Sequence, residues 1–310
     1  MDVVVIGAGL AGLMAAREAK RSGHEVVVLE KSRSSGGRCA TRRIDGAVID
    51  HGAQFFTVRS NEFAALVDEW QRMGIVREWC KGFGNGDGHP RYCGTTGMTS
   101  IAKHLARGLD VRFDAMAFSV ERAGTHWRVS LDDGSSLLAD RVVLTCPVPQ
   151  SMALLVNAGI EVPDGIRTIE YDKTIAALVV VEGDCNVPPP GGVQDADDTF
   201  SFVADNHQKG VSSIGALTFH CNPVFSETHW WSDATDSHRR VMELAQPWIG
   251  AARVVQHQPK RWRMATPRTI WHDRCWSSDG VVLAGDAFGG PRVEGAVLSG
   301  LAAGVRVLEA

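Results

Sequence analysis

The stretch from Val3 to Gly12, VVVIGAGLAG, is typical of a buried strand followed by a glycine-rich turn and the start of a helix. Gly7 permits the tight turn, Gly9 lets the backbone approach a pyrophosphate, and Gly12 lets the helix pack closely on the strand. The N-terminus of that helix directs free N–H groups and a partial positive charge at the phosphates. We therefore predict a dinucleotide site with backbone contacts from six consecutive residues: Gly7, Ala8, Gly9, Leu10, Ala11 and Gly12.

A second strand, Val26–Leu29, follows the predicted helix and ends at Glu30, 18 residues after Gly12. A carboxylate at this place accepts hydrogen bonds from ribose hydroxyls, and Lys31 lies directly beside it. The two strands, the glycine turn between them and the acid at this spacing together indicate a Rossmann-like nucleotide-binding unit.

Two further elements indicate which dinucleotide is bound. The Gly36-Gly37 pair brings the backbone close to a bulky group, and Arg38 places a fixed cation beside it, as a pyrophosphate requires. Near the other end, a buried strand ends in Gly285-Asp286, and an apolar helix follows from about Gly295. Asp286 can bind a polyol hydroxyl, and the helix can direct its positive end at an electron-rich ring. FAD has both of these groups and a nicotinamide dinucleotide has neither, whereas a purely structural strand and helix would leave the Gly-Asp pair unexplained.

These residues resemble the flavin-containing amine oxidase superfamily, whose E-x5-GGR element matches Glu30 to Arg38. Three shorter elements resemble its bacterial renalase branch: DxGAQFFT at 50–57, GxxGMxSI at 94–101, and Gly285-Asp286 with RVEGAxxSG at 292–300. The resemblance runs from Val3 to the C-terminus and implies bound FAD. The further cofactor contacts that we predict in and beside these elements are Gly52, Ala53, Gln54, Ala117, Val293, Glu294, Gly295 and Ala296.

His220 is the first candidate on the substrate side. It follows a predicted strand, Ser213–Phe219, and can face the flavin, where a neutral imidazole orients a substrate or takes a proton. A hydrogen-bonded core or surface histidine is the competing interpretation, and the sequence leaves both open.

Asn206 and Arg292 complete the predicted catalytic set. The resemblance places a substrate-contacting asparagine and a basic residue in the polar turn that holds Asn206 and Lys209, although both are also ordinary turn residues. Arg292 lies beside the flavin-facing helix and can pair either with a substrate phosphate or with a structural carboxylate. Two tryptophans are candidates for the walls of the pocket: Trp262 and Trp271.

The predicted substrate class depends on the absence of the aromatic cage that binds amines. Amine oxidases of this superfamily typically hold the amine between two aromatic rings, usually tyrosines, whereas this chain has only Tyr92 and Tyr171, both outside the segments expected to form that cage. Resemblance to bacterial renalase implies instead a dihydropyridine, an isomeric form of NAD(P)H that is oxidised to NAD(P)+ with oxygen as acceptor and hydrogen peroxide as product. An amine oxidase and a non-catalytic flavin-binding protein remain the alternatives.

Composition and motif spacing exclude several other classes. The net charge of −4 argues against a nucleic-acid or anionic-membrane surface, and no apolar run approaches the roughly 18–20 residues that span a bilayer. Seven cysteines without a CxxC pair fit reduced thiols in the cytoplasm. The sequence has no HxH or HExxH spacing that would indicate a metal site. It also has no second GxGxxG unit preceded by a strand, which would indicate a bound nicotinamide cofactor.

The organisation indicates an α/β protein of two interleaved domains: a Rossmann-like FAD domain of the glutathione-reductase/amine-oxidase type, and an α+β substrate domain with a mixed sheet. We assign 1–56, 92–149 and 277–310 to the FAD domain, and 57–91 and 150–276 to the substrate domain.

Hydrophobic periodicity predicts further elements inside both domains. The first domain should hold an antiparallel meander with a turn at Asp132-Asp133-Gly134, and the second an amphipathic helix from about Phe63 to Met73 and another around His238–Ile249.

Overall fold

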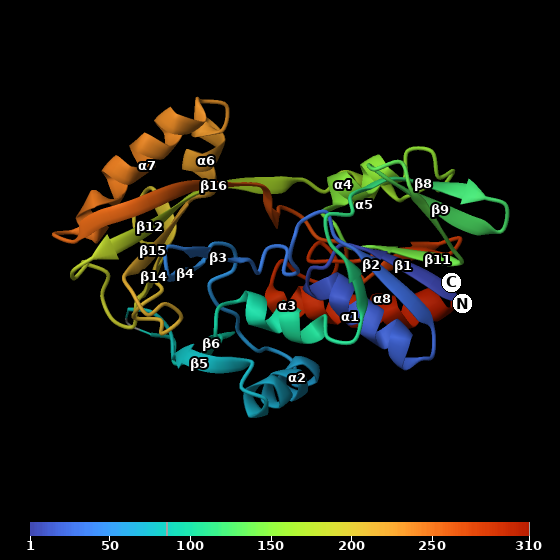
Figure 1. Cartoon of the computed structure of the whole chain (residues 1–310), viewed down its shortest axis with the longest axis horizontal. Coiled ribbons are helices and arrows are strands. Elements are labelled where there is room, and N and C mark those ends of the chain that lie inside the picture. Colours follow the sequence, from blue (N-terminus) through green and yellow to red (C-terminus); the bar gives the residue numbers. More distant parts are fainter. Residues whose placement is uncertain (85, 310) are drawn as a thin grey trace.

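The computed structural model describes residues 1–84 and 86–309, which form two lobes side by side (Figure 1). The first lobe is built on a six-stranded sheet, in which five strands run parallel and one edge strand is antiparallel. In spatial order its strands are β17 (Trp276–Ser278), β18 (Val281–Leu283), β11 (Arg141–Leu144), β1 (Asp2–Ile6), β2 (Glu25–Leu29) and β7 (Asp110–Arg112).

The alternation of side chains along β1 divides the core of this lobe into two layers. Val3 and Val5 join one buried cluster and Val4 and Ile6 join another, since successive residues of a strand point to opposite faces. The first layer is covered by helices: α1 (Leu10–Arg21), α2 (Asn61–Arg72), α3 (Thr99–Leu105) and α8 (Val293–Glu309). The sheet is therefore buried on both faces, as expected for parallel strands.

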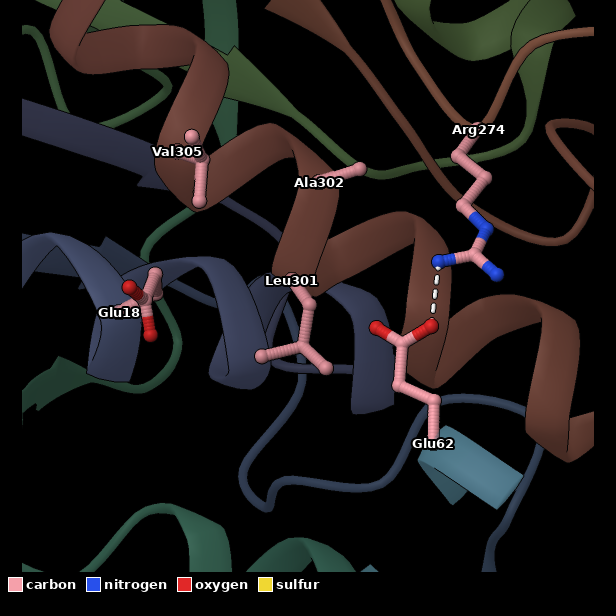
Figure 2. A pocket seen from close by; sticks show the side chains of 6 residues that line it. All are labelled: Glu18, Glu62, Arg274, Leu301, Ala302 and Val305. Atoms are coloured by element: carbon pink, nitrogen blue, oxygen red, sulfur yellow. Dashed lines mark hydrogen bonds and ion pairs between the residues drawn. The ribbon is translucent and has the colours of Figure 1, made fainter. Parts of the chain in front are cut away.

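Helices α1 and α8 approach very closely because small residues separate their backbones. A Cβ added to Gly300 of α8 would lie 2.2 Å from the carbonyl oxygen of Ala11 in α1. The outer side of α8 carries Leu301, which faces a surface pocket bounded by an ion pair of 2.7 Å between Arg274 and Glu62 (Figure 2). The last helix of the chain is thus held directly against the first.

The predicted meander is confirmed and covers the second layer. Its strands are β8 (Ala117–Ala123), β9 (His126–Leu131) and β10 (Ser136–Ala139), in the spatial order β10-β9-β8. Gly134 closes the expected turn with a hydrogen bond of 3.1 Å to the carbonyl of Leu131. Two short helices complete this layer: α4 (Val148–Leu154) and α5 (Asp164–Arg167).

The second lobe is a five-stranded sheet in which every pair is antiparallel. In spatial order its strands are β13 (Gly192–Gln194), β14 (Phe200–Asp205), β15 (Ala216–Cys221), β12 (Tyr171–Glu182) and β16 (Arg253–Pro267). The mixed α/β class is confirmed, but the mixed sheet lies in the first lobe and not in the second, where we predicted it. The outer face of the antiparallel sheet in the second lobe is covered by α6 (Pro223–His229) and α7 (Ala234–Ile249).

A hairpin from the N-terminal part of the chain, β3 (Thr41–Ile44) and β4 (Ala47–Asp50), packs on the inner face of that sheet. Ile44, Ala47 and Ile49 form a small core with residues of β12 and β15. A second hairpin joins β5 (Val76–Cys80) to β6 (Arg91–Gly94). Chain segments cross between the lobes several times, and the exact domain limits stay a prediction.

Most predicted elements agree with the structure, with small shifts at their ends. The helix expected from about Phe63 is α2, capped by Ser60, and the helix expected around His238 begins earlier, at Ala234, because Asp233 caps it. The strand expected at Ser213–Phe219 is β15, which includes His220 instead of ending before it. Of the helices described, none has the length and hydropathy needed to cross a membrane.

Candidate active site

The glycine turn before α1 leaves an open cradle at one residue. A Cβ on Gly12 would lie 1.9 Å from the carbonyl oxygen of Gly7, whereas a Cβ on Gly9 would meet no atom within 4 Å. Gly9 is the N-cap of α1, and no side chain caps the helix. The first-turn N–H groups of Leu10 to Gly12 precede the first intrahelical hydrogen bond, so they are free to bind an anion. Gly37 faces the cradle, since its Cβ would lie 3.5 Å from the Cα of Gly9.

Glu30 is buried at the end of β2, beside this turn. One carboxylate oxygen accepts a hydrogen bond of 2.8 Å from the N–H of Ala8, and the other accepts one of 2.9 Å from the N–H of Ser32. The second oxygen also accepts from the Ser32 hydroxyl, so the oxygen bonded to Ala8 is the one that keeps a lone pair for a ribose hydroxyl. The carbonyl of Glu30 accepts from Ala115, so the backbone that leads to the partly buried Ala117 runs beside it. Lys31 is exposed and its Nζ lies 3.5 Å from Gln150.

Arg38 and Asp286, predicted to bind different parts of the cofactor, lie together and form an ion pair. A guanidinium nitrogen of Arg38 lies 2.7 Å from Oδ1 of Asp286, and Arg38 also donates to the carbonyl of Ala265 in β16. Both side chains keep some exposure. The GGR element near the N-terminus and the Gly-Asp pair near the C-terminus therefore meet at one place.

The start of α8 supplies a second set of backbone donors. Its first intrahelical hydrogen bond joins the N–H of Ala296 to the carbonyl of Arg292, so the N–H groups of Val293 to Gly295 come before it. Gly295 is required here, because a Cβ would lie 2.1 Å from the carbonyl oxygen of Gly290. Gly285 is buried and its N–H donates to the hydroxyl of Ser299 in the same helix.

The side chain of Glu294 has a different role from the predicted one. Its carboxylate accepts hydrogen bonds from the backbone N–H groups of Arg59 and Ser60, each of 2.9 Å, and from the Ser60 hydroxyl. These donors lie at the start of α2. The side chain therefore ties α8 to α2, and only the backbone of Glu294 is left for a cofactor.

The segment after β4 places two unpartnered polar atoms beside these loops. Gly52 lies against Arg38, whose carbonyl also accepts from the N–H of Ala53 at 2.8 Å. Gln54 donates through Nε2 to the carbonyls of Asp50 and Gly52. Within the part of the chain that the structure describes, Oε1 of Gln54 and Nδ1 of His51 are buried and have no hydrogen-bond partner.

His220 lies on the inner face of the five-stranded sheet, in a row that crosses four strands. The pairing register sets Phe202, His220, Ala176 and Lys260 side by side. Nε2 of His220 lies 3.2 Å from the carbonyl oxygen of His51, and Nε1 of Trp262 donates to the same oxygen at 2.8 Å. Because a carbonyl only accepts, Nε2 of His220 carries the proton and Nδ1 is the free acceptor.

The rings around this carbonyl form an aromatic surface. His51 stacks on Trp262, with ring centroids 5.4 Å apart and an interplanar angle of 18°. On the opposite side of His220, Phe202 packs against Phe55 with centroids 5.6 Å apart. A flat, uncharged ring is the kind of group that such a surface accommodates.

Both histidines are neutral at pH 7. Burial lowers the pKa of His220 to about 4, although its bond to the His51 carbonyl opposes the shift, and Lys209 lowers it further. Burial, followed by the charges of Lys260 and Arg42, lowers the pKa of His51 to about 3. The charged side chains that shift these two pKa values are all cations.

Asn206 and Lys209 are not placed to touch a substrate, which corrects our prediction. Nζ of Lys209 lies 2.8 Å from Oδ2 of Asp50, and both side chains are 0% exposed. Asn206 is fully buried; its Oδ1 accepts from the N–H of Asp50, and its Nδ2 donates to Ala216 and Thr218. Both side chains are used to hold Asp50, the residue before His51.

The remaining candidates are divided between the lobes. Arg292 is exposed at the start of α8. Trp262 contacts His51, as described above, whereas Trp271 packs with the core of the first lobe and its backbone N–H donates to Ala287. Three residues of this region were not predicted from the sequence as site residues: His51, Arg42 and Lys260. His51 stands inside the DxGAQFFT element, and Lys260 alternates with Trp262 along β16, so a signal existed for both.

Comparison with known proteins identifies the family. A family described as flavin containing amine oxidoreductase matches residues 70–308, and an NAD(P)-binding Rossmann-like domain matches residues 5–70. The chain belongs to the flavin-containing amine oxidoreductase family. This confirms the superfamily, the FAD cofactor and the class of FAD-dependent oxidoreductase that the sequence predicts.

Close sequence similarity is confined to a short part of the chain. Putrescine oxidase of Kocuria rosea is 48% identical over 68 residues, which cover 22% of this chain and 14% of that protein. A putative flavin-containing monoamine oxidase of Mycobacterium tuberculosis is 48% identical over 69 residues, 22% of this chain and 15% of the relative. The chain thus matches less than a sixth of the length of these relatives.

Similarity of fold extends over the whole chain. The crystal structure of a putative protoporphyrinogen oxidase from Exiguobacterium sp. 255-15 superposes with a TM-score of 0.75 at 15% identity, covering 100% of this chain and 99% of the other. Putrescine oxidase bound to putrescine gives a TM-score of 0.71 at 15% identity, with coverage of 100% and 99%. At these identities the likeness shows the fold alone.

The residues of these loops and helix starts fit FAD. The open cradle at Gly9 and the uncapped start of α1 suit a pyrophosphate, Glu30 suits a ribose, and Asp286 suits a polyol chain. The unpartnered Gln54 Oε1 and His51 Nδ1 suit a ring that carries polar N–H and carbonyl groups. No group of three or more potential metal ligands gathers among the residues described.

Gly9→Val should weaken FAD binding without unfolding the protein. The backbone of Gly9 has φ −75° and its Cβ would enter open space, so the apoprotein tolerates a side chain there. The side chain then fills the cradle, and we expect FAD affinity to fall by about tenfold or more, equivalent to about 1.4 kcal/mol. FAD titration monitored by fluorescence quenching measures this, and Gly12→Ala, which clashes with Gly7, should instead lower the melting temperature of the apoprotein. An unchanged FAD affinity in Gly9→Val would place the phosphates elsewhere.

Lys209→Met should destabilise the protein strongly. Removing one partner of a fully buried ion pair leaves the Asp50 charge without compensation, at a cost of about 3–5 kcal/mol. In the double variant Asp50→Asn/Lys209→Met that charge is gone, and Asn keeps an oxygen for the N–H of Met98. We expect urea denaturation of the FAD-loaded variants to show much of the lost stability restored in the double variant. Equal stability of the single and double variants would contradict the role assigned to the pair.

Proposed function

We propose that this chain is an FAD-dependent oxidase that removes a hydride from a dihydropyridine nucleotide, an isomeric form of dihydro-NAD(P), and passes the electron pair to molecular oxygen. The observation that supports this most directly is the character of the surface around the His51 carbonyl. His220 and His51 are neutral, the Trp262 ring is flat, and the charges that act on the two histidines are positive. A neutral aromatic ring on an anionic nucleotide is complementary to that surface.

The chemistry of a dihydropyridine needs little help from the protein. When bound, FAD supplies a two-electron acceptor for the hydride and a route for the electron pair to oxygen. The substrate ring loses one hydride and becomes an aromatic pyridinium, and oxygen takes the electron pair, that hydrogen and one proton to form hydrogen peroxide. Because aromatisation drives the loss of hydride, no general base is required.

The chain's own residues would bind and orient the substrate ring. His220 and Trp262 both donate to the His51 carbonyl, which fixes the two rings relative to each other. The free Nδ1 of His220 would accept a hydrogen bond from the carboxamide of the substrate. Phe55 and Phe202 would cover the other side of the ring and exclude water.

An amine substrate is the second candidate, since putrescine oxidase is a relative. An amine is cationic at neutral pH, and the positive charges of Arg42 and Lys260 would repel it. The two tyrosines do not form a cage: Tyr92 stacks on Phe56, and the Tyr171 ring lies 5.7 Å from the guanidinium of Arg38. The dihydropyridine therefore suits the site better.

Stopped-flow mixing of the FAD-loaded protein with substrates tests the proposal. We expect isomers of dihydro-NAD(P) reduced at positions other than C4 to bleach the flavin band rapidly without oxygen, and one hydrogen peroxide to form per dihydropyridine when oxygen is admitted. Bleaching by putrescine and not by any dihydropyridine would establish the amine oxidase instead. The absence of bleaching with both classes would leave a non-catalytic flavin-binding protein.

The stability of the protein should fall as the pH decreases from about 6.5 to about 4. His220 stays unprotonated in the folded protein down to a pKa of about 4, whereas the unfolded chain binds this proton near its ordinary pKa of about 6.5. Between these values the unfolded state holds more protons, so the free energy of unfolding drops by up to about 1.4 kcal/mol per pH unit for each such histidine. His220→Gln should reduce this slope in urea denaturation, and the exposed control His272→Gln should not. An unchanged slope in His220→Gln would show that the histidine titrates in the folded protein.

A further inference from the structure

Two cations near the site have no carboxylate partner. Arg42 of β3 donates at 3.0 Å to Oε1 of Gln258 in β16, and Nζ of Lys260 lies 4.2 Å above the centroid of the Trp262 ring. Among the described residues, neither side chain forms a salt bridge. Two other cations in the interior of this region do: Lys209 pairs with Asp50 and Arg38 with Asp286.

The two charges lie close enough to oppose each other. Both side chains are partly buried, and burial, followed by the charge of Arg42, lowers the pKa of Lys260. Bringing like charges together in a partly dehydrated place is unfavourable unless an anion joins them. The arrangement is therefore complete only with a negatively charged group between or beside the two side chains.

The position of this pair along β16 matches the length of a nucleotide. Ala265 accepts from Arg38 at the cofactor end of the strand, and Trp262 contacts His51 further along. At about 3.3 Å per residue, Lys260 and Gln258 lie about 7 Å and about 13 Å beyond Trp262, on the side away from Arg38. In the row between His220 and Lys260 stands Ala176, so only one small, buried side chain separates the histidine from the lysine along the sheet.

We propose that Arg42 and Lys260 form a phosphate-binding subsite that selects phosphate-bearing substrates. This rests on the proposed function, because the dihydropyridine ring must occupy the surface formed by His51, His220 and Trp262. Gln258 would hold the guanidinium of Arg42 in place, so that its remaining N–H groups bind two phosphate oxygens side by side. Lys260 would add a second, mobile positive charge.

The subsite predicts a difference between two substrates that share one ring. For the FAD-loaded variants Arg42→Gln and Lys260→Gln, we expect the KM for the dihydropyridine dinucleotide to rise about tenfold, the loss expected for one charged hydrogen bond. The KM for the corresponding riboside, which has the same ring and no phosphate, should not change. Arg43→Gln is the control, since Arg43 is exposed on the same strand. An equal rise in KM for both substrates would overturn the subsite.

Binding of inorganic pyrophosphate gives a readout that does not depend on turnover. We expect calorimetry to show binding to the FAD-loaded wild type and to Arg43→Gln, and about tenfold weaker binding to Arg42→Gln and Lys260→Gln. Equal binding to all four proteins, or to none, would also overturn the subsite. If no dihydropyridine is oxidised but pyrophosphate binding depends on Arg42 and Lys260, the proposed function fails and the subsite stands for another phosphate-bearing substrate.

Discussion

The buried ion pair between Asp50 and Lys209 is the contact on which both halves of the site depend. Asp50 ends the β3–β4 hairpin, and Lys209 lies 159 residues later, in the turn before β15. The pair fixes the N-terminal segment against the inner face of the second sheet, and the hydrogen bonds of Asn206 add to it. The next residue, His51, consequently presents its carbonyl to His220 and Trp262, and Gln54 follows toward the cofactor loops. A single charge pair thus aligns the substrate surface with the flavin-binding elements.

The cofactor side is built on a different principle, that of close backbone approach. At Gly12, Gly295 and Gly300 a Cβ would meet a carbonyl oxygen of a neighbouring loop or helix, so two helix starts point at the same region. Gly9, by contrast, has open space in front of it, where a ligand group fits. Side-chain charge is supplied there by Glu30 and by the pair of Arg38 and Asp286.

The sequence was informative where the signal is local and silent where it depends on distant pairing. The first strand–helix–strand unit, the meander and the Gly-Asp strand carry their patterns within a few residues, and the structure contains all of them. Asn206 and Lys209 looked like solvent-facing turn residues because the partner that buries them is far away in the chain. The roles of Arg42 and Lys260 depend on the register of β12 with β16 and on the docking of β3, which no local pattern encodes. His220 was predicted from its residue type and its place beside a strand, but its neutral state results mainly from burial, which the local sequence does not reveal.

The meeting of Arg38 with Asp286 has a consequence for biosynthesis. During synthesis on a ribosome the glycine turn and Glu30 are made well before Asp286 and α8. Strand β18, which borders β11, arrives equally late. The nascent chain therefore contains the residues of the phosphate site long before it contains those that contact the rest of the dinucleotide. Stable uptake of the flavin must wait until α8 docks on α1, so the flavin is bound only after α8 has been made.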